Sequence, residues 1–249
     1  MRPRPHPPAL PHGEIEEPLP GLFFVTGTVR MPMPVPILFS RAMTIVREGQ
    51  RLVLVNSVRL DDAGLAKLDA LGKVTDVIRL AGNHGADDPF YKERYGARVW
   101  APKGAPYMPG FDAKAEPYFE PDERYETGST LPIAGAVVHL IHSSPPEAVL
   151  VVPAHGGVAI TGDAMQNWAK TDPFFNLPAK WMMKVMGFIK PCNVGPAWLK
   201  QCKPPASDLR AILDLPFDKV LPSHGFPVLG GAREAYRAAV EAAAQQRGG

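Results

Sequence analysis

The sequence predicts a mixed α/β (α+β) fold, and two features of its apolar pattern support this prediction. Three strand patterns follow one another in the second half of the chain, at residues 136–142, 148–152 and 158–163. In the first half, a β-hairpin pattern is followed by helix patterns that alternate with strand patterns. Successive strands without helices between them favour mixed sheets with antiparallel parts over a doubly wound parallel sheet.

The first half of the chain shows its elements most clearly. Residues 40–47 and 51–57 are rich in β-branched and apolar side chains and flank a short turn that contains Gly49, which predicts a hairpin. Asp61 and Asp62 are suitable N-caps for a helix whose apolar residues recur at helical spacing, and Gly72 ends it. A closing helix rich in Ala, Glu and Arg is predicted near the C-terminus, over residues 232–246.

The loop at residues 82–90 is the first candidate site. It follows an apolar run, residues 77–81, that predicts a buried strand, and it precedes a predicted helix. His84 and Asp88 lie four residues apart on this Gly-containing loop, where side chains of metal and catalytic sites are commonly placed. A turn followed by a helix start would use the same residue types without any function. The loop alone therefore leaves both interpretations open.

Composition restricts the class of protein. The chain has 249 residues, of which 45% are hydrophobic and 21% charged, as expected for a globular protein with a full core. The formal net charge of +2 gives no indication of nucleic-acid binding. Two cysteines are too few for a disulfide framework, no apolar run reaches the ~20 residues that span a bilayer, and the N-terminus lacks an apolar signal region. We therefore expect a cytoplasmic protein.

Proline is unusually frequent, with 29 residues, and marks the domain organisation. Residues 1–20 are Pro-rich and polar, which predicts a disordered arm or an extended one. Residues 21–249 are expected to form a single domain. Within it, the segment at about 164–218 is expected to be a helical insertion rich in aromatic residues and lysine.

Polar side chains of one chemical kind recur where predicted strands end. Each follows an apolar run and is itself followed by turn residues, and loops at one edge of a layered sheet can bring such residues together. Imidazole and carboxylate groups are the ligands that zinc, iron and manganese take in proteins. The sequence therefore predicts a metal site formed by His84, Asp88, His142, Asp163 and His224.

In order and spacing these motifs resemble the metallo-β-lactamase-fold superfamily, over roughly residues 22–245. The first family motif, T-H-x-H-x-D-H, corresponds to residues 83–89, in which His84 and Asp88 match the first His and the Asp. Ala86 and Pro89 stand where the family has its other two histidines. The remaining motifs correspond to segments 142–145, 162–163 and 222–225.

The resemblance implies an αββα four-layer sandwich of two mixed β-sheets flanked by helices. It also implies a metal-dependent hydrolase that acts on an ester, amide, thioester or phosphoester of a small molecule. Loss of two ligand histidines implies a reduced site that holds one ion, zinc or alternatively iron or manganese, rather than two. Asp88 and Asp163 are then the expected catalytic carboxylates, with Asp88 orienting the attacking water or taking its proton.

The same two losses support an alternative. A member of this fold whose site no longer holds a metal would be catalytically inactive and would act as a binding or scaffold module. The surviving residues would then have local roles, such as capping the helix after residue 87 or hydrogen-bonding loop backbone.

The insertion at 164–218 allows three interpretations. It contains many large apolar residues, and from Lys170 to Lys203 it has six lysines against one acidic residue, Asp172. A packed helical hairpin is favoured, because large apolar side chains are usually buried. The alternatives are a lid over the site, which would suit an anionic substrate with an apolar group, and contact with an anionic membrane surface.

Overall fold

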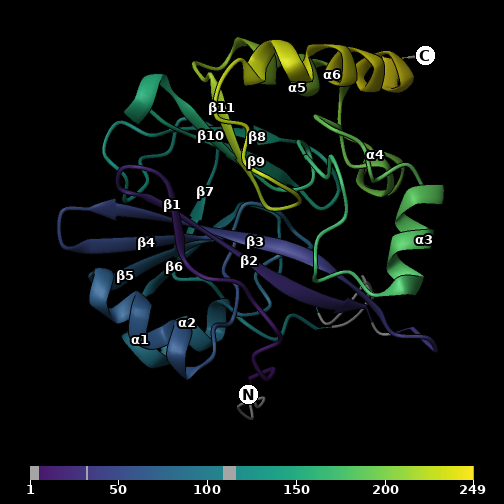
Figure 1. Ribbon diagram of the computed structural model, residues 1–249. Helices are drawn as coiled ribbons and strands as arrows, with labels where there is room; N and C mark the ends of the chain where they lie inside the picture. The colour runs from purple at the N-terminus through teal and green to yellow at the C-terminus, as the bar shows by residue number, and fades with distance from the viewer. Residues whose placement is uncertain (1–5, 32, 109–115, 249) are drawn as a thin grey trace.

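The computed structural model describes residues 6–31, 33–108 and 116–248, and it has four layers. Two β-sheets pack face to face, and helices cover the outer face of each (Figure 1). Both sheets contain parallel and antiparallel neighbours. The predicted sandwich of two mixed sheets flanked by helices is therefore confirmed.

The first sheet has seven strands in the order β1-β2-β3-β4-β5-β6-β7. Strands β1 to β4 are antiparallel, and β4 to β7 run parallel. The parallel half carries the loop of His84, which follows β5. Its strands are β1 (Glu16–Leu19), β2 (Leu22–Met31), β3 (Ile37–Glu48), β4 (Arg51–Val55), β5 (Lys73–Ile78), β6 (Arg98–Pro102) and β7 (Glu123–Tyr125).

The second sheet has four strands in the order β11-β10-β9-β8. Strands β8, β9 and β10 are antiparallel neighbours, whereas β10 and β11 are parallel. Because β10 and β11 run in the same direction, the residues that follow them, Asp163 and His224, emerge at the same edge of the sheet. The strands are β8 (Val137–Ile141), β9 (Glu147–Val152), β10 (Val158–Thr161) and β11 (Lys219–Pro222).

Helices cover both outer faces of the sandwich. Helices α1 (Asp62–Leu71) and α2 (Asp88–Tyr95) pack on the seven-stranded sheet, as their buried Leu65, Leu68 and Tyr91 show. The other outer face is covered by α4 (Pro196–Cys202), α5 (Ala206–Ala211) and α6 (Ala232–Gly248). Helix α3 (Leu177–Val185) lies beside the far end of β2 and β3 (Figure 1). Two 3-10 turns complete the elements, η1 (Ala154–Gly156) and η2 (Ile212–Asp214).

Apolar residues fill each of the three spaces between layers. The cluster between the sheets includes Val53, Ile78, Leu150 and Ile160, all of which are at most 1% exposed. Alternate residues of the same strands face the helices, because strand side chains alternate between faces. Burial on both faces explains why these strands appear in the sequence as nearly continuous apolar runs.

Part of the N-terminal arm is paired with the first sheet. We expected residues 1–20 to be disordered or extended; residues 1–5 lie outside the described part, and residues 6–20 are ordered against the first sheet. Gly13 N–H donates to the carbonyl of Thr26 over 2.7 Å, and β1 pairs with β2. His12 accepts a hydrogen bond from the backbone N–H of Asp61 at 3.0 Å. Backbone pairing along the edge of the sheet therefore orders this Pro-rich segment.

Residues 164–218 include helices α3, α4 and α5, and this segment is only partly packed into the core. Trp168, Met183 and Trp198 are buried, whereas Trp181 is 72% exposed. Within the described part of the chain, no helix is both long enough and apolar enough to cross a membrane.

Candidate metal centre

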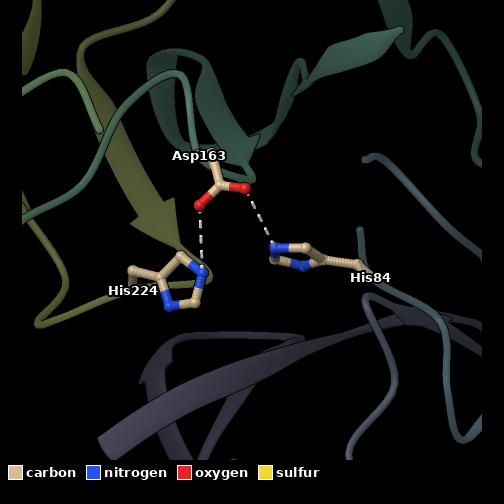
Figure 2. Close-up of side chains that lie close together, drawn as sticks. All are labelled: His84, Asp163 and His224. Atoms are coloured by element: carbon tan, nitrogen blue, oxygen red, sulfur yellow. Dashed lines mark ion pairs between the residues drawn. The ribbon is translucent and has the colours of Figure 1, made fainter. Parts of the chain in front are cut away.

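Three side chains from three different loops meet at one edge of the sandwich (Figure 2). His84 lies between β5 and α2, Asp163 follows β10, and His224 follows β11. Nε2 of His84 lies 3.6 Å from Oδ2 of Asp163, and Nε2 of His224 lies 3.2 Å from Oδ1 of the same carboxylate. The two imidazole centroids are 5.1 Å apart. One potential ligand atom from each residue lies within 4.8 Å of the other two.

This arrangement suits a metal ion in both its chemistry and its spacing. Two imidazoles and a carboxylate form a donor set of catalytic zinc sites, which use three protein ligands and leave one position open. Ligand atoms about 2.1 Å from a tetrahedral ion lie about 3.4 Å from one another. The separations of 3.2 and 3.6 Å, measured to the two different oxygens of the Asp163 carboxylate, are close to that spacing.

The shifted pKa values of the site residues favour the protonation states that bind a cation. Burial alone would raise the pKa of Asp163, but the imidazoles of His224 and His84 outweigh burial and hold the pKa well below its usual range. Burial lowers the pKa of His84, and the nearby charges of His224 and Arg41 lower it further against the opposing effect of Asp163. At neutral pH the carboxylate is therefore ionised and the His84 imidazole is neutral, as metal ligands must be.

A buried arginine holds the loop that carries His84. The guanidinium of Arg79, which is 1% exposed, donates to the carbonyls of Ala81 and Gly82 on one side and of Ala105 and Pro106 on the other. Four carbonyl acceptors compensate for burying this charge. These hydrogen bonds therefore tie the residues just before His84 to the segment that follows β6.

Gly85 then allows the tight turn after His84. Its φ is +85°, a conformation that disfavours any side chain, and a Cβ there would collide with the carboxylate of Asp88.

His224 is held by groups from two other segments. Its Nδ1 lies 3.4 Å from the carbonyl oxygen of Ser40, and its ring packs against Trp168 with centroids 4.9 Å apart. The Trp168 indole N–H in turn donates to the Ser40 hydroxyl over 2.8 Å. Gly225 permits this packing, because a Cβ at its φ of +102° would overlap the backbone of Asn167. Contacts of this kind fix the orientation of a ligand imidazole.

Asp163 is positioned by two polar side chains. The amide of Gln166 donates to Oδ1 of Asp163 over 2.9 Å. Oε1 of Glu147, which is fully buried on β9, accepts a hydrogen bond of 2.6 Å from the backbone N–H of Ala164. Glu147 therefore anchors the turn on which Asp163 stands.

Asp88, predicted as a ligand and as a catalytic carboxylate, is not part of this group. It is completely buried, where Oδ1 accepts from the hydroxyl of Ser57 at 2.6 Å and Oδ2 accepts from the hydroxyl of Tyr107 at 2.5 Å. Burial raises the pKa of Asp88, against the opposing effect of the two hydroxyls. Both oxygens are engaged, so the structure gives Asp88 a role in joining α2 to two neighbouring loops. The structure therefore does not place Asp88 beside His84, Asp163 and His224.

His142 is also outside the group. Its side chain is 70% exposed, and Nδ1 lies 2.8 Å from Oδ2 of Asp208 on α5. Asp208 also accepts from the backbone N–H of His142, so the whole residue is turned toward α5. Of the five predicted ligands the structure therefore brings together three. Asp87 does not replace a missing one, because its carboxylate pairs with Arg41 and accepts from the backbone N–H of Arg59.

Sequence reasoning missed the side chains that support the site. Asn56 accepts from Leu80 N–H over 2.8 Å and donates to the Ser223 hydroxyl over 2.6 Å, so it connects the segment between β5 and His84 with the residue before His224. Three further polar residues likewise hold the loops of the site in place: Arg79, Glu147 and Gln166. Their common signal is a polar residue within or beside an apolar strand, which sequence alone cannot assign to a partner.

Replacing Glu147 by glutamine should remove a pH dependence of stability. Burial raises the pKa of Glu147 well above its usual range, and the charge of Asp163 raises it further. A raised pKa in the folded state means that stability is greatest below the unfolded value and falls as pH rises toward the folded value. Each pH unit in that interval lowers the folding equilibrium up to about tenfold. The shifted pKa values of His84 and Asp88 affect both proteins alike. Chemical denaturation from pH 5 to 8 with chelator present should therefore show that the stability of the wild type relative to Glu147→Gln falls as pH rises.

The lowered pKa of Asp163 does not interfere with this measurement, because its stabilising effect is complete above its unfolded pKa of about 3.9. Parallel profiles for the two proteins would contradict the interpretation.

The fold is that of the metallo-β-lactamases. Metallo-β-lactamase FIM-1 from Pseudomonas aeruginosa, in its mono-zinc form, aligns with a TM-score of 0.62 and 15% identity, covering 96% of this chain and 97% of that one. The metallo-β-lactamases from Hirschia baltica and Pontibacter korlensis give TM-scores of 0.56 and 0.59, with 18% and 15% identity. These alignments cover 94% and 93% of this chain and 97% and 98% of the others.

Comparison of the sequence with protein-family models and with curated proteins gave no match. At these identities the structural likeness establishes the architecture of the chain. The His84, Asp163 and His224 group is a possible metal site within that architecture.

Proposed function

We propose that this protein is a metal-dependent hydrolase of small molecules whose site holds one ion through His84, Asp163 and His224. The observation that carries the proposal is the convergence of these three side chains with the spacing of metal ligands. Its similarity to metallo-β-lactamases, one of them in a mono-zinc form, supports a metal-dependent hydrolase and agrees with a single ion. Zinc is the preferred metal, with iron and manganese as alternatives.

When bound, such an ion lowers the pKa of a water molecule toward ~7 and stabilises negative charge on a substrate oxygen. Asp163 and the imidazoles of His84 and His224 hold the ion. Gln166 and Glu147 keep the Asp163 carboxylate in place, and the Ser40 carbonyl orients the His224 ring. Substrates of the proposed reaction are esters, amides, thioesters or phosphoesters.

An inactive binding module is the second candidate, and two observations favour it. Ala86 and Pro89 occupy positions where the resembling family has histidines, and Asp88 is engaged by Ser57 and Tyr107. Without those histidines a bound ion has fewer ligands, and the engaged Asp88 carboxylate is not free to take up the proton of an attacking water. Both candidates have the same fold, and only the hydrolase would turn over a substrate.

Metal analysis tests the proposal first. Protein purified without chelator should contain about one equivalent of zinc, iron or manganese, or should take up about one equivalent on reconstitution. Less than about 0.1 equivalent, with no gain on reconstitution, would overturn the single-metal site.

Hydrolysis then separates the two candidates. A panel of chromogenic esters, thioesters, lactams and phosphodiesters should show turnover that Asp163→Ala abolishes. Metal uptake with no turnover on the panel would favour the binding module, and in that case restored hydrolysis after Ala86→His with Pro89→His would support it further.

A further inference from the structure

Among the described residues, most of the exposed large apolar side chains lie on or beside helix α3. Among the described residues, eight large apolar side chains are exposed, and six of them lie on α3, just after it, or in the turn between β2 and β3. Residues four apart share a helix face. Three such residues of α3 therefore form one stripe, and with the neighbouring exposed residues they define what we call the α3 surface: Leu177, Trp181, Val185, Met186, Met33 and Val35.

The two parts of the α3 surface are held together. Asn176, the N-cap of α3, donates through its side chain to the carbonyl of Pro36 over 2.7 Å and accepts from the N–H of Leu38. The opposite face of the helix is buried, with Ala179 at 0% and Met183 at 2% exposure in the same apolar cluster as Trp168. The exposed stripe is therefore the outer face of a helix whose inner face is already packed.

The segments that carry the α3 surface are positively charged. Residues 173–207 contain five lysines and no acidic residue, and residues 18–47 contain no acidic residue either. Lys180 and Lys184 each directly precede a residue of the stripe, and within the described residues neither forms an ion pair. Lys190 and Arg30 add exposed positive charge nearby on the chain. Because the whole chain carries only +2, this concentration is local.

We propose that the α3 surface docks the protein onto anionic lipid bilayers. A helix with Trp and Leu on one face and lysine beside them is the arrangement that lies in a membrane interface, with the aromatic ring at the level of the head groups. The apolar side chains project outward, and the charge favours an anionic surface. The docking does not depend on the proposed hydrolase activity.

Binding of the full chain to vesicles tests this directly. Phosphatidylcholine vesicles that contain about one quarter phosphatidylserine should bind the protein at low salt, and pure phosphatidylcholine vesicles should bind it at least about tenfold more weakly. Raising the ionic strength to about 0.5 M should weaken binding to the anionic vesicles, because charges are then screened within a few ångströms. Absence of partition onto anionic vesicles at low salt would overturn the proposal.

Matched variants locate the surface. Leu177→Ala with Trp181→Ala should reduce partition at least about tenfold, because it removes the apolar anchor. Lys184→Glu with Lys190→Glu should also reduce it at least about tenfold, since each basic residue near an anionic surface contributes about fivefold. The control is Arg51→Glu with Lys73→Glu, which makes the same change in net charge on exposed residues at the other end of the first sheet (Figure 1).

The control variant should bind like the wild type. Equal losses in the control and in the lysine variant would show attraction by net charge alone and would contradict docking through α3.

Tryptophan fluorescence reports which residue enters the interface. Trp181 is the exposed tryptophan of this surface, whereas Trp168 and Trp198 are 1% and 4% exposed. Emission should shift to shorter wavelength on adding anionic vesicles and should be quenched by brominated lipid, and Trp181→Phe should lose both effects while it still binds.

Self-association is the competing outcome. If sedimentation shows a dimer that Trp181→Ala dissociates, and vesicles produce no shift, a second copy of the chain covers this surface and the lipid proposal fails.

Discussion

Replacing His84, Asp163 or His224 by alanine is expected to weaken metal binding by more than about 100-fold in each case. Even residues that only support a ligand contribute about 10–100-fold to metal affinity, so removing a ligand should have a larger effect. Each of the three supplies a ligand atom to the same group, so none can substitute for another. Calorimetric titration of chelator-treated protein with zinc measures the change.

His142→Ala is the matched control for this series. It removes an imidazole that is 70% exposed and paired with Asp208, so zinc affinity should stay within about threefold of the wild type. A loss comparable to that of His84→Ala would show that His142 turns toward the site on metal binding. The three-residue description would then be contradicted.

Asp88→Ala is expected to destabilise the fold strongly while leaving the metal affinity of the folded protein nearly unchanged. The substitution leaves the buried hydroxyls of Ser57 and Tyr107 without their acceptor. Each unsatisfied buried group costs about 1–3 kcal/mol, so a total of about 3 kcal/mol is expected. In a chain of this size that corresponds to a decrease in melting temperature of roughly 6–12 °C.

Asp88→Asn provides the comparison, because it keeps one acceptor and should show a smaller decrease in melting temperature. Zinc affinity is then measured by titration at a temperature where both variants are folded. If folded Asp88→Ala loses zinc affinity about 100-fold, Asp88 is a ligand after all, and its hydrogen bonds to Ser57 and Tyr107 must be exchanged on binding.

The architecture was largely predictable because it depends on patterns that are local in sequence. Strands buried on both faces appear as apolar runs, and the hairpin of residues 40–57 is marked by its turn. Strand β1 was not predicted, because a Pro-rich segment has a weak strand pattern. Its order comes instead from backbone pairing with β2, a partner that the sequence of the arm does not specify.

The candidate site was predictable only in part, for a related reason. His84, Asp163 and His224 follow strands β5, β10 and β11, and their positions in space are set by the strands. The direction in which Asp88 and His142 point is set by partners far away in sequence. Ser57 is 31 residues from Asp88, and Asp208 is 66 residues from His142.

The sequence by itself determined most of the order of strands and helices, the strand ends that carry histidine and aspartate, and the presence of Ala86 and Pro89 in the loop of His84. The tertiary structure decided which of those side chains meet and which face of α3 is exposed. The physical reason is that burial and hydrogen bonding satisfy each polar group with whatever partner the packed layers bring near it. Such partners, including Tyr107 for Asp88 and the Ser40 carbonyl for His224, are known only once the sheets have packed.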